Sequence, residues 1–522
     1  MTKGRQRLAL LAIVAAAAAV RLPLLVSGLP YLGYVDEGHV LHPVQHLVRA
    51  GGWDPGWYGY PSLTIYAIAG AVHAVRPAYR LVHGHSLLLD LPEKEDYYDA
   101  ISPPELVLAG RVVVVLASLL TVALGMSLAR RLGGDRAAVA SGLLLAFCPA
   151  LVQRSPIVIV DTVAALFTTA AFLAAEALRA AVLDTGPDGA RARRLALAAG
   201  ALSGLAAAAK YPSALVFAAV ALAAFAGRAR PLESLRLTAL AGAGAAAAAF
   251  AAMPALVTRT RQVADSLAAQ SRFYSIPFGP SLLRQALSPW EMGPSLLVAG
   301  TIGVVALLSR RATRGAALGW VTFGVLLVTP LALYKMQPFR NVLPVVVVLL
   351  VGAGCLVGDG APLARRPVAS IALVGVLLAS IVPGLSVVFR ERMARDSRVS
   401  LVDVLAGPEW KGRRALVQRE LAILPSELAR AACETEVAPW EALPTLAASG
   451  RFDLVVFGRF EDEKTLLPDW VERARPFEAR AVALPRVATF GSMRTSVNPG
   501  FWRSNDELVI AARLEAAGKR AP

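Results

Sequence analysis

Two adjacent carboxylates, Asp36 and Glu37, follow the first apolar stretch of the chain and precede Gly38 and His39. A carboxylate at a membrane surface can deprotonate an acceptor hydroxyl or hold a metal ion. Acids that flank a membrane span are also common as the solvated end of that span. The pair is therefore a candidate catalytic site, and a solvated helix end is its alternative.

All six histidines of the chain lie between positions 39 and 85. His39, His42 and His46 have the spacing i, i+3, i+7, which places them on one face of a helix. Together with Glu37 they could form a site for zinc or another divalent metal. The alternative is a helix whose polar face uses imidazole, and Pro43 would disturb such a helix. A divalent metal is thus a candidate cofactor, and no other cofactor is indicated.

Three charged residues lie next to apolar stretches. Asp161, Lys210 and Arg340 are each at a point where one predicted membrane helix gives way to the next. Charges at membrane depth are costly and therefore indicate function. The alternative is a helix end whose side chain reaches water, which suits Arg111 and Arg340 better than the short side chain of Asp161. Cations there suit an anionic phosphate, and carboxylates suit a hydroxyl or amine acceptor.

The elements that must position these residues are membrane helices. Of the 522 residues, 56% are hydrophobic and only 17% are charged, whereas a soluble domain averages about a quarter charged. The apolar residues form repeated blocks of about the length that crosses a bilayer core. We expect a mainly α polytopic bundle with about eleven spans, at 8–27, 106–128, 137–151, 163–178, 195–209, 213–226, 237–257, 295–308, 316–333, 342–356 and 368–388.

The net charge of +16 first suggests nucleic acid, but its distribution indicates a membrane protein without a nucleic-acid partner. With the N-terminus in the cytoplasm, each even-numbered helix returns to a basic cluster, as the positive-inside rule requires. The C-terminus is then extracytoplasmic, and the alanine- and arginine-rich composition favours a bacterial inner membrane. The clusters are Arg130-Arg131 with Arg136, Arg191 with Arg193-Arg194, Arg228 with Arg230 and Arg236, Arg310-Arg311 with Arg314, and Arg365-Arg366.

Two parts of the chain lie outside this pattern of spans. The apolar stretch 61–75 is short and carries polar aromatic residues, so it predicts an interfacial helix within a large first external loop, 29–104. Residues 1–390 are then the transmembrane domain, and 391–522 form a small α/β domain outside the cytoplasm. Within it we expect a buried strand at 452–457 and helices at 415–424 and 508–516.

Several short motifs occur in a characteristic order from the first helix to about Gly354. They are Asp36-Glu37, Gly52-Trp53-Asp54-Pro55, Tyr60-Pro61-Ser62-Leu63, Arg111 with Arg130-Arg131-Leu132-Gly133-Gly134, Pro149 through Asp161, Lys210-Tyr211 and Gln337-Pro338-Phe339-Arg340. With these motifs the chain resembles the GT-C superfamily of membrane glycosyltransferases, specifically the protein-O-mannosyltransferase and aminoarabinose-transferase-like group, family 39.

The resemblance implies inverting transfer of a hexosyl or pentosyl group from a polyprenyl-phosphate sugar to a glycan, lipid or protein acceptor on the outer membrane face. It implies Asp36 as general base or acceptor-positioning carboxylate, with Glu37 beside it, and Asp161 as a second acidic residue. Stabilising the charge that develops on the departing lipid phosphate should matter most. The substrate-binding residues that it implies are Tyr60, Arg111, Lys210, Tyr211, Arg272 and Arg340.

The chain departs from the family pattern in two places. The aminoarabinose-transferase type begins its interfacial helix with Lys-Pro-Pro, where this chain has Gly59-Tyr60-Pro61-Ser62. That difference argues against lipid A as the acceptor. The tail carries no carbohydrate- or peptide-binding signature, so protein O-mannosylation is not favoured over transfer to a glycan or lipid.

Two other functions remain as alternatives. A transporter or flippase of lipid-linked sugars would also carry charges within a helical bundle, although transporters more often show inverted repeats and broken helices near the bilayer midplane. A receptor or scaffold would use the tail as its working part. The charges at the outer rim and the large first loop favour the enzyme. The sequence has no Walker loop, Rossmann glycine pattern or serine elbow, so nucleotide hydrolysis and serine chemistry lack support.

Overall fold

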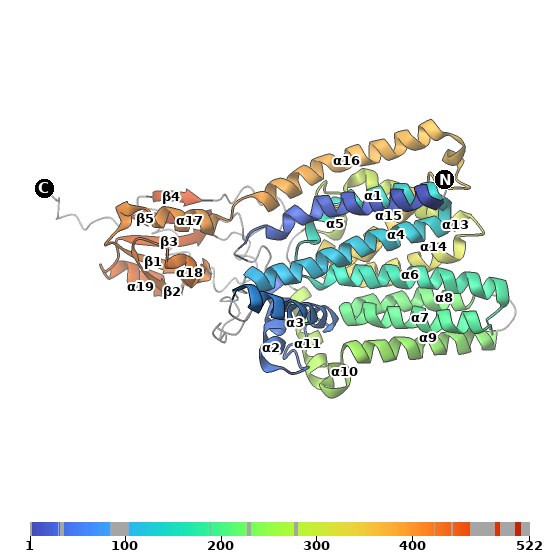
Figure 1. Ribbon diagram of the computed structural model, residues 1–522, viewed down its shortest axis with the longest axis horizontal. Coiled ribbons are helices and arrows are strands. Elements are labelled where there is room, and N and C mark those ends of the chain that lie inside the picture. Colours follow the sequence, from blue (N-terminus) through green and yellow to red (C-terminus); the bar gives the residue numbers. More distant parts are fainter. Residues whose placement is uncertain are drawn as a thin grey trace. The chain divides into compact units, whose positions relative to one another are not determined.

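The chain divides into two units, each described here by itself. The membrane unit comprises Met1–Leu25, His39–Leu89 and Glu105–Arg390, and the C-terminal unit comprises Val26–Gly38, Asp90–Pro104 and Glu391–Pro522. Part of the first loop thus groups with the tail. The computed structural model (Figure 1) describes residues 3–29, 31, 36–83, 104–187, 189–226, 231–275, 280–421, 423–439, 442–459, 486–490 and 507–512.

The membrane unit is built from helices, and its long helices run alongside one another (Figure 1). All eleven predicted apolar spans lie on helices or helix pairs. The helices are α1 (Lys3–Arg21), η1 (Leu22–Val26), α2 (Asp36–Ala50), α3 (Leu63–His83), α4 (Pro104–Phe147), α5 (Pro149–Arg154), α6 (Val160–Thr185), α7 (Ala190–Ala209), η3 (Tyr211–Val216), α8 (Phe217–Ala224), α9 (Pro231–Ala252), α10 (Ala255–Thr258), α11 (Thr260–Tyr274), α12 (Leu282–Ala286), α13 (Gly293–Ser309), α14 (Arg314–Leu333), η4 (Phe339–Val342), α15 (Leu343–Cys355), η5 (Pro362–Arg365) and α16 (Pro367–Met393).

Six helical segments in the described part of the chain are long and apolar enough to cross a membrane, and three shorter apolar helices accompany them. A multi-pass membrane protein is therefore confirmed, whereas the count of eleven spans stays a prediction. The six are Arg7–Val26, Glu105–Phe147, Val160–Asp184, Pro231–Ala252, Arg314–Leu333 and Pro367–Leu405, and the shorter ones are Tyr211–Ala224, Gly293–Ser309 and Phe339–Cys355.

Helix α4 is two helices that meet at Gly134, where φ is 75° and ψ is −167°. A backbone with positive φ favours glycine, because a Cβ would strain it. The two arms pack against each other, since a Cβ on Gly125 would clash with Leu145 and one on Gly142 would lie 2.7 Å from Met126. A straight helix would separate those residues by tens of ångströms. Gly134 therefore makes the turn between the predicted spans 106–128 and 137–151.

Helix α15 lies in the core of the membrane unit. Eleven of its residues are buried, and it packs against α13 and α6. A helix that is apolar on all sides is stable only when it is surrounded. Its first turn follows η4 directly, so the loop that carries Arg340 leads straight into this buried helix.

The C-terminal unit contains a five-stranded sheet in the order β2-β1-β3-β5-β4. Strands β2, β1 and β3 are parallel, and β5 is antiparallel to both β3 and β4. The strands are β1 (Arg414–Gln418), β2 (Glu434–Ala438), β3 (Leu454–Arg459), β4 (Arg486–Phe490) and β5 (Glu507–Ala512); the helices are α17 (Ser397–Leu405), η6 (Pro408–Trp410), η7 (Arg419–Leu421), α18 (Pro425–Leu428) and α19 (Leu443–Ala448).

Both faces of this sheet are covered. Alternate residues of β1 point to opposite faces, so Val417 packs with Leu401 of α17, while Leu416 packs with Leu443 of α19. The predicted strand at 452–457 is confirmed as β3. The predicted helices at 415–424 and 508–516 are wrong, because β1 and β5 begin there. Short apolar runs fit either element, and only pairing with neighbouring strands decides between them.

Close packing of α7 on α9 depends on glycine. A Cβ on Gly200 would clash with the carbonyl oxygen of Ala241, whereas the nearest atom to a Cβ on Gly242 would be a Phe217 ring carbon at 3.8 Å. We expect Gly200→Ala to force the backbones apart at a cost of about 1–3 kcal/mol and to lower the midpoint of thermal unfolding in detergent. Gly242→Ala on the same helix pair should leave it unchanged, and equal midpoints for both variants would refute this account.

Candidate active site

The ends of three elements bring charged side chains together in the membrane unit. Asp161 is in the first turn of α6, where the helix dipole favours a carboxylate. Lys210 follows α7 in an extended conformation, with φ −154° and ψ 122°, and so leaves the helix before η3 begins. Arg340 and Asn341 belong to η4, which starts after Pro338. Residues distant in sequence thus meet where helices end.

These four residues form a nearly buried group that we call the cation cluster. The Lys210 ammonium donates to the Asp161 carboxylate and, at 2.5 Å, to Asn341 Oδ1. The Arg340 Nε lies 4.0 Å from the second carboxylate oxygen of Asp161. The side chains of Lys210 and Arg340 are only 12% and 14% exposed. The sequence analysis predicted three of these residues, and the structure brings them together.

The cation cluster places two cations beside the carboxylate of Asp161. In a largely desolvated setting a cation attracts an anion far more strongly than it would in water. Preorganised cations of this kind stabilise negative charge that develops on an oxygen during a reaction. The cluster is therefore suited to a phosphate group.

Asn341 and Tyr274 were missed by the sequence analysis. Asn341 Nδ2 donates to the Tyr274 hydroxyl at 3.5 Å, and Met336 N donates to the Tyr274 carbonyl at 3.1 Å. The ring of Tyr274 lies 5.6 Å from that of Tyr334. The end of α11 therefore packs on the loop before η4. In the sequence, Asn341 was indicated by its position directly after Arg340.

Tyr211 connects the cation cluster to the loop after α2. Its hydroxyl donates to the Tyr58 carbonyl at 3.0 Å, and the Tyr58 hydroxyl donates to Asp54 Oδ1 at 2.5 Å. Arg259 lies 3.3 Å from the other oxygen of Asp54. The motif Gly52-Trp53-Asp54-Pro55 thus ties its loop to α10 and α11.

Two pKa values in this loop reflect the same contacts. The hydrogen bond from Tyr58, with help from the Gly56 N–H and Arg259, lowers the pKa of Asp54 although partial burial opposes it. Burial and the Asp54 carboxylate raise the pKa of Tyr58 to about 12. Because the pKa of Asp54 is lowered on folding, its contribution to stability is present above the ordinary carboxyl pKa and is lost as the pH falls through the lowered value. The contacts of Asp54 with Tyr58 and Arg259 therefore hold the loop in place at neutral pH.

Three other predicted residues lie elsewhere. Arg272 is exposed on α11 and donates to the Ala268 carbonyl of its own helix. Arg111 is 1% exposed and donates to the Leu25 carbonyl at 2.9 Å, so the alternative of a side chain that reaches water is wrong. Tyr60 makes edge contacts with the rings of Trp57 and His39. Their substrate-binding roles stay predictions.

The histidine group does not provide a metal site in its present geometry. Helix α2 continues through Pro43, yet no group of three or more His, Cys, Asp or Glu residues in the described ranges is placed to hold a metal ion. The His39 ring stacks instead on Trp57, with 5.1 Å between centroids. Metal binding by His39, His42 and His46 therefore stays a prediction without support from geometry.

Asp36 and Glu37 are the first two residues of α2. Their exposed fractions are 8% and 0%. Carboxylates in a first turn stabilise the helix through its dipole. They group with the C-terminal unit.

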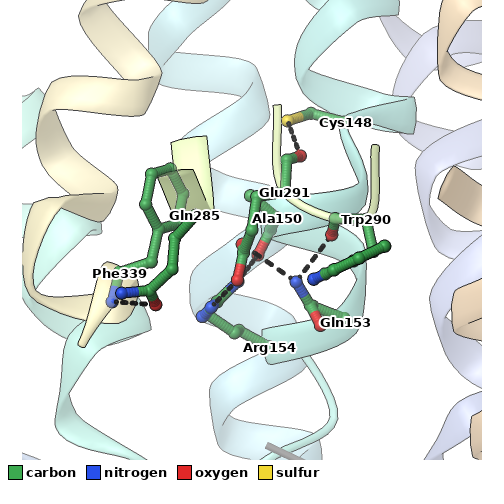
Figure 2. Close-up of polar contacts among 8 residues, drawn as sticks. All are labelled: Cys148, Ala150, Gln153, Arg154, Gln285, Trp290, Glu291 and Phe339. Carbon is green, nitrogen blue, oxygen red and sulfur yellow. Dashed lines mark hydrogen bonds and ion pairs between the residues drawn. The ribbon is translucent and has the colours of Figure 1, made fainter. Parts of the chain in front are cut away.

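A second buried group holds the loop that carries Arg340 (Figure 2). The Arg154 guanidinium, at the end of α5, donates two parallel hydrogen bonds of 2.5 Å to the Glu291 carboxylate. Gln153 donates to Glu291 Oε2 at 3.0 Å and to the Trp290 carbonyl at 2.8 Å. The Ala150 N–H donates to the Glu291 carbonyl at 3.0 Å. The segment before α13 is therefore fastened to α5.

The same group reaches η4. The Arg154 guanidinium lies 5.6 Å from the centre of the Phe339 ring. The Phe339 N–H donates to Gln285 Oε1 at 3.1 Å (Figure 2), and Gln285 Nε2 donates to the Gln337 carbonyl at 2.6 Å. Phe339 immediately precedes Arg340. The ion pair of Arg154 with Glu291 thus helps to position η4, and neither residue stood out in the sequence.

Comparison with known proteins identifies the fold of the chain. Residues 100–255 match the family model for dolichyl-phosphate-mannose-protein mannosyltransferase. Among curated proteins, no sequence matches the chain. Among solved structures, ArnT from Cupriavidus metallidurans bound to undecaprenyl phosphate is similar over 96% of this chain and 97% of its own, with TM-score 0.52 and 16% identity. The chain has the GT-C fold.

A second match to the GT-C fold comes from another kind of enzyme. The apo oligosaccharyltransferase of Archaeoglobus fulgidus is similar over 94% of this chain and 73% of its own, with TM-score 0.54 and 13% identity. Identities this low concern the fold alone. The predicted resemblance to GT-C glycosyltransferases is confirmed by these structural matches together with the family model.

Removing one partner of the buried ion pair leaves the other charge uncompensated. We expect Glu291→Gln to cost about 3–5 kcal/mol of stability and to lower the midpoint of thermal unfolding in detergent. A matched control is Arg236→Gln, because Arg236 pairs with Glu233 on α9 but its side chain is 68% exposed. That change should leave the midpoint unchanged. Similar midpoints for both variants would contradict the role given to Glu291.

Proposed function

We propose that this GT-C protein is a glycosyltransferase that moves a sugar from a polyprenyl-phosphate-linked donor to an acceptor at the outer face of the membrane, with inversion at the anomeric carbon. The observation that carries the proposal is the cation cluster, in which the Lys210 ammonium and the Arg340 guanidinium lie beside the Asp161 carboxylate. The fold match to ArnT bound to undecaprenyl phosphate supports the same class of donor.

The cation cluster would act on the leaving group. When the bond between the anomeric carbon and the phosphate oxygen breaks, negative charge develops on the lipid phosphate. Lys210 and Arg340 are held by Asp161 and Asn341, so they need little reorganisation to stabilise that charge. Asp161 would position the Lys210 ammonium rather than exchange protons with the substrate.

Asp36 would act on the acceptor. An acceptor hydroxyl or amine becomes a better nucleophile when a carboxylate accepts its proton as the new bond forms. Asp36 opens α2 and is nearly buried, and Glu37 is its neighbour. The acceptor is a glycan, a lipid or a protein. Oligosaccharyltransferase tethered to an acceptor peptide shares the fold, so a peptide remains among the acceptors to be tested.

The proposal is tested by sugar transfer with protein purified in detergent and labelled polyprenyl-phosphate hexose and pentose donors. We expect wild type to consume a donor and Asp36→Asn to lose that activity. Equal consumption by both would remove Asp36 from the mechanism. If neither consumes any donor, yet reconstituted protein moves labelled lipid between leaflets, the protein is a flippase of lipid-linked sugars instead.

A second expectation concerns Arg340. Arg340→Gln removes one of the two cations beside the carboxylate of Asp161. We expect kcat to fall about 10²- to 10³-fold, the usual effect of losing one group that stabilises a developing anion, and free undecaprenyl phosphate to inhibit less strongly. The control is Arg261→Gln, because Arg261 is exposed on α11. Equal kcat for the two variants would contradict a role for Arg340 in the transfer step.

A further inference from the structure

A segment of the first loop is built into the C-terminal unit. Residues Val26–Gly38 group with that unit, and Tyr31 is 1% exposed within its core. The Tyr31 side chain belongs to the same apolar cluster as Leu401 and Leu405 of α17 and Val417 of β1. An aromatic ring from a loop therefore fills a position in the core of a sheet-containing unit more than 350 residues further along the chain.

Arg398 covers the ring of Tyr31. Its guanidinium carbon lies 3.9 Å from the ring centre, a distance at which a cation is attracted to the face of an aromatic ring. Arg398 is held in turn by Asp396, through two hydrogen bonds of 2.9 and 2.8 Å. Asp396 also accepts from the Arg398 N–H at the start of α17. Both charged side chains are nearly buried, so this arrangement is preorganised rather than a chance surface contact.

A hydrogen bond before Tyr31 also holds the segment. The Ser27 hydroxyl donates to the Arg392 carbonyl at 2.6 Å. Between these points the chain turns, because the Tyr31 N–H donates to the Gly28 carbonyl at 2.9 Å and Gly28 has a φ of 70°. Burial raises the pKa of the Tyr31 phenol above its ordinary value, so the ring is neutral beneath Arg398.

Tyr31 is close in sequence to the candidate base. Asp36 is five positions after Tyr31, and a fully extended chain covers at most about 18 Å in five steps. A fixed Tyr31 therefore restricts where the start of α2 can lie. Asp36 and Glu37 group with the same unit as Tyr31.

We propose that Tyr31 and Arg398 are positioning residues, through which the C-terminal unit holds the Asp36–Glu37 segment in place for attack by the acceptor. This inference rests on the proposed function, and it gives the tail a role in the acceptor half of the reaction. Neither residue belongs to the cation cluster, which is the group proposed to act on the donor phosphate. Loss of the anchor should therefore reduce acceptor-dependent turnover while the affinity for the donor lipid phosphate is retained.

The test compares Tyr31→Ala with Phe452→Ala in the full-length protein. Phe452 is a matched control, because it is a buried aromatic residue 3% exposed on the other face of the same sheet. Two arginines, Arg414 and Arg451, also lie over its ring, at 5.7 and 5.4 Å. Each variant removes a buried ring beneath an arginine, but only Tyr31→Ala removes the anchor.

Three readouts are measured below the unfolding temperature of every variant: hydrogen exchange of residues 26–38, acceptor-dependent kcat, and inhibition by undecaprenyl phosphate. Tyr31→Ala should speed exchange in that segment and lower kcat at least tenfold, with inhibition within twofold of wild type. Phe452→Ala should speed exchange around β1 and β3 and keep kcat within threefold. Tyr31→Phe, which keeps the ring under Arg398, should restore both exchange and kcat.

The outcomes separate this proposal from the proposed function. Equal losses of kcat in Tyr31→Ala and Phe452→Ala would show that Tyr31 only stabilises the fold, and would overturn the positioning role. Faster exchange in Tyr31→Ala with unchanged kcat would overturn it too, while transfer activity stands. If wild type transfers sugar from no donor, the proposed function fails and the positioning role fails with it, whatever the exchange data show.

Discussion

The buried pair of Arg154 and Glu291 is the interaction on which the arrangement of the membrane unit's charged groups depends. Two ions taken out of water are stable only when their geometry is good and their remaining hydrogen-bonding atoms are satisfied. Here two parallel hydrogen bonds join the ions, and Gln153 and the backbone around Ala150 complete the group. The pair thereby ties the segment before α13 to α5, and through Phe339 and Gln285 it constrains η4.

Two buried charged groups of the membrane unit differ in composition. Arg154 and Glu291 are one cation and one anion, joined by two hydrogen bonds. In the cation cluster, Lys210 and Arg340 both lie beside the carboxylate of Asp161. Buried charges are costly to maintain and are candidates for function. The ion pair serves the fold, and the cation cluster is the part suited to chemistry on a phosphate.

The segment between α1 and α4 is divided between the two units. Its later part, with Tyr58 and Asp54, is tied to Tyr211 and Arg259 within the membrane unit. Its earlier part, with Ser27 and Tyr31, is tied within the C-terminal unit. In the proposed reaction, departure of the lipid phosphate depends on residues held within the membrane unit, and activation of the acceptor depends on a residue that groups with the C-terminal unit. Similarity of fold alone would not reveal these roles, because function resides in specific sites.

The sequence by itself indicated a multi-pass helical membrane protein, because long apolar blocks are local patterns that do not depend on which helices touch. It also singled out Asp161, Lys210 and Arg340, since a charge beside an apolar block is conspicuous wherever it occurs. Only the tertiary structure decided that Asn341 and Tyr274 join them, that Glu291 partners Arg154, and that 414–418 and 507–512 are strands. Polar partners and strand pairings come from residues far apart in the chain, so no local pattern encodes them; packing selects them when the helices and the sheet assemble.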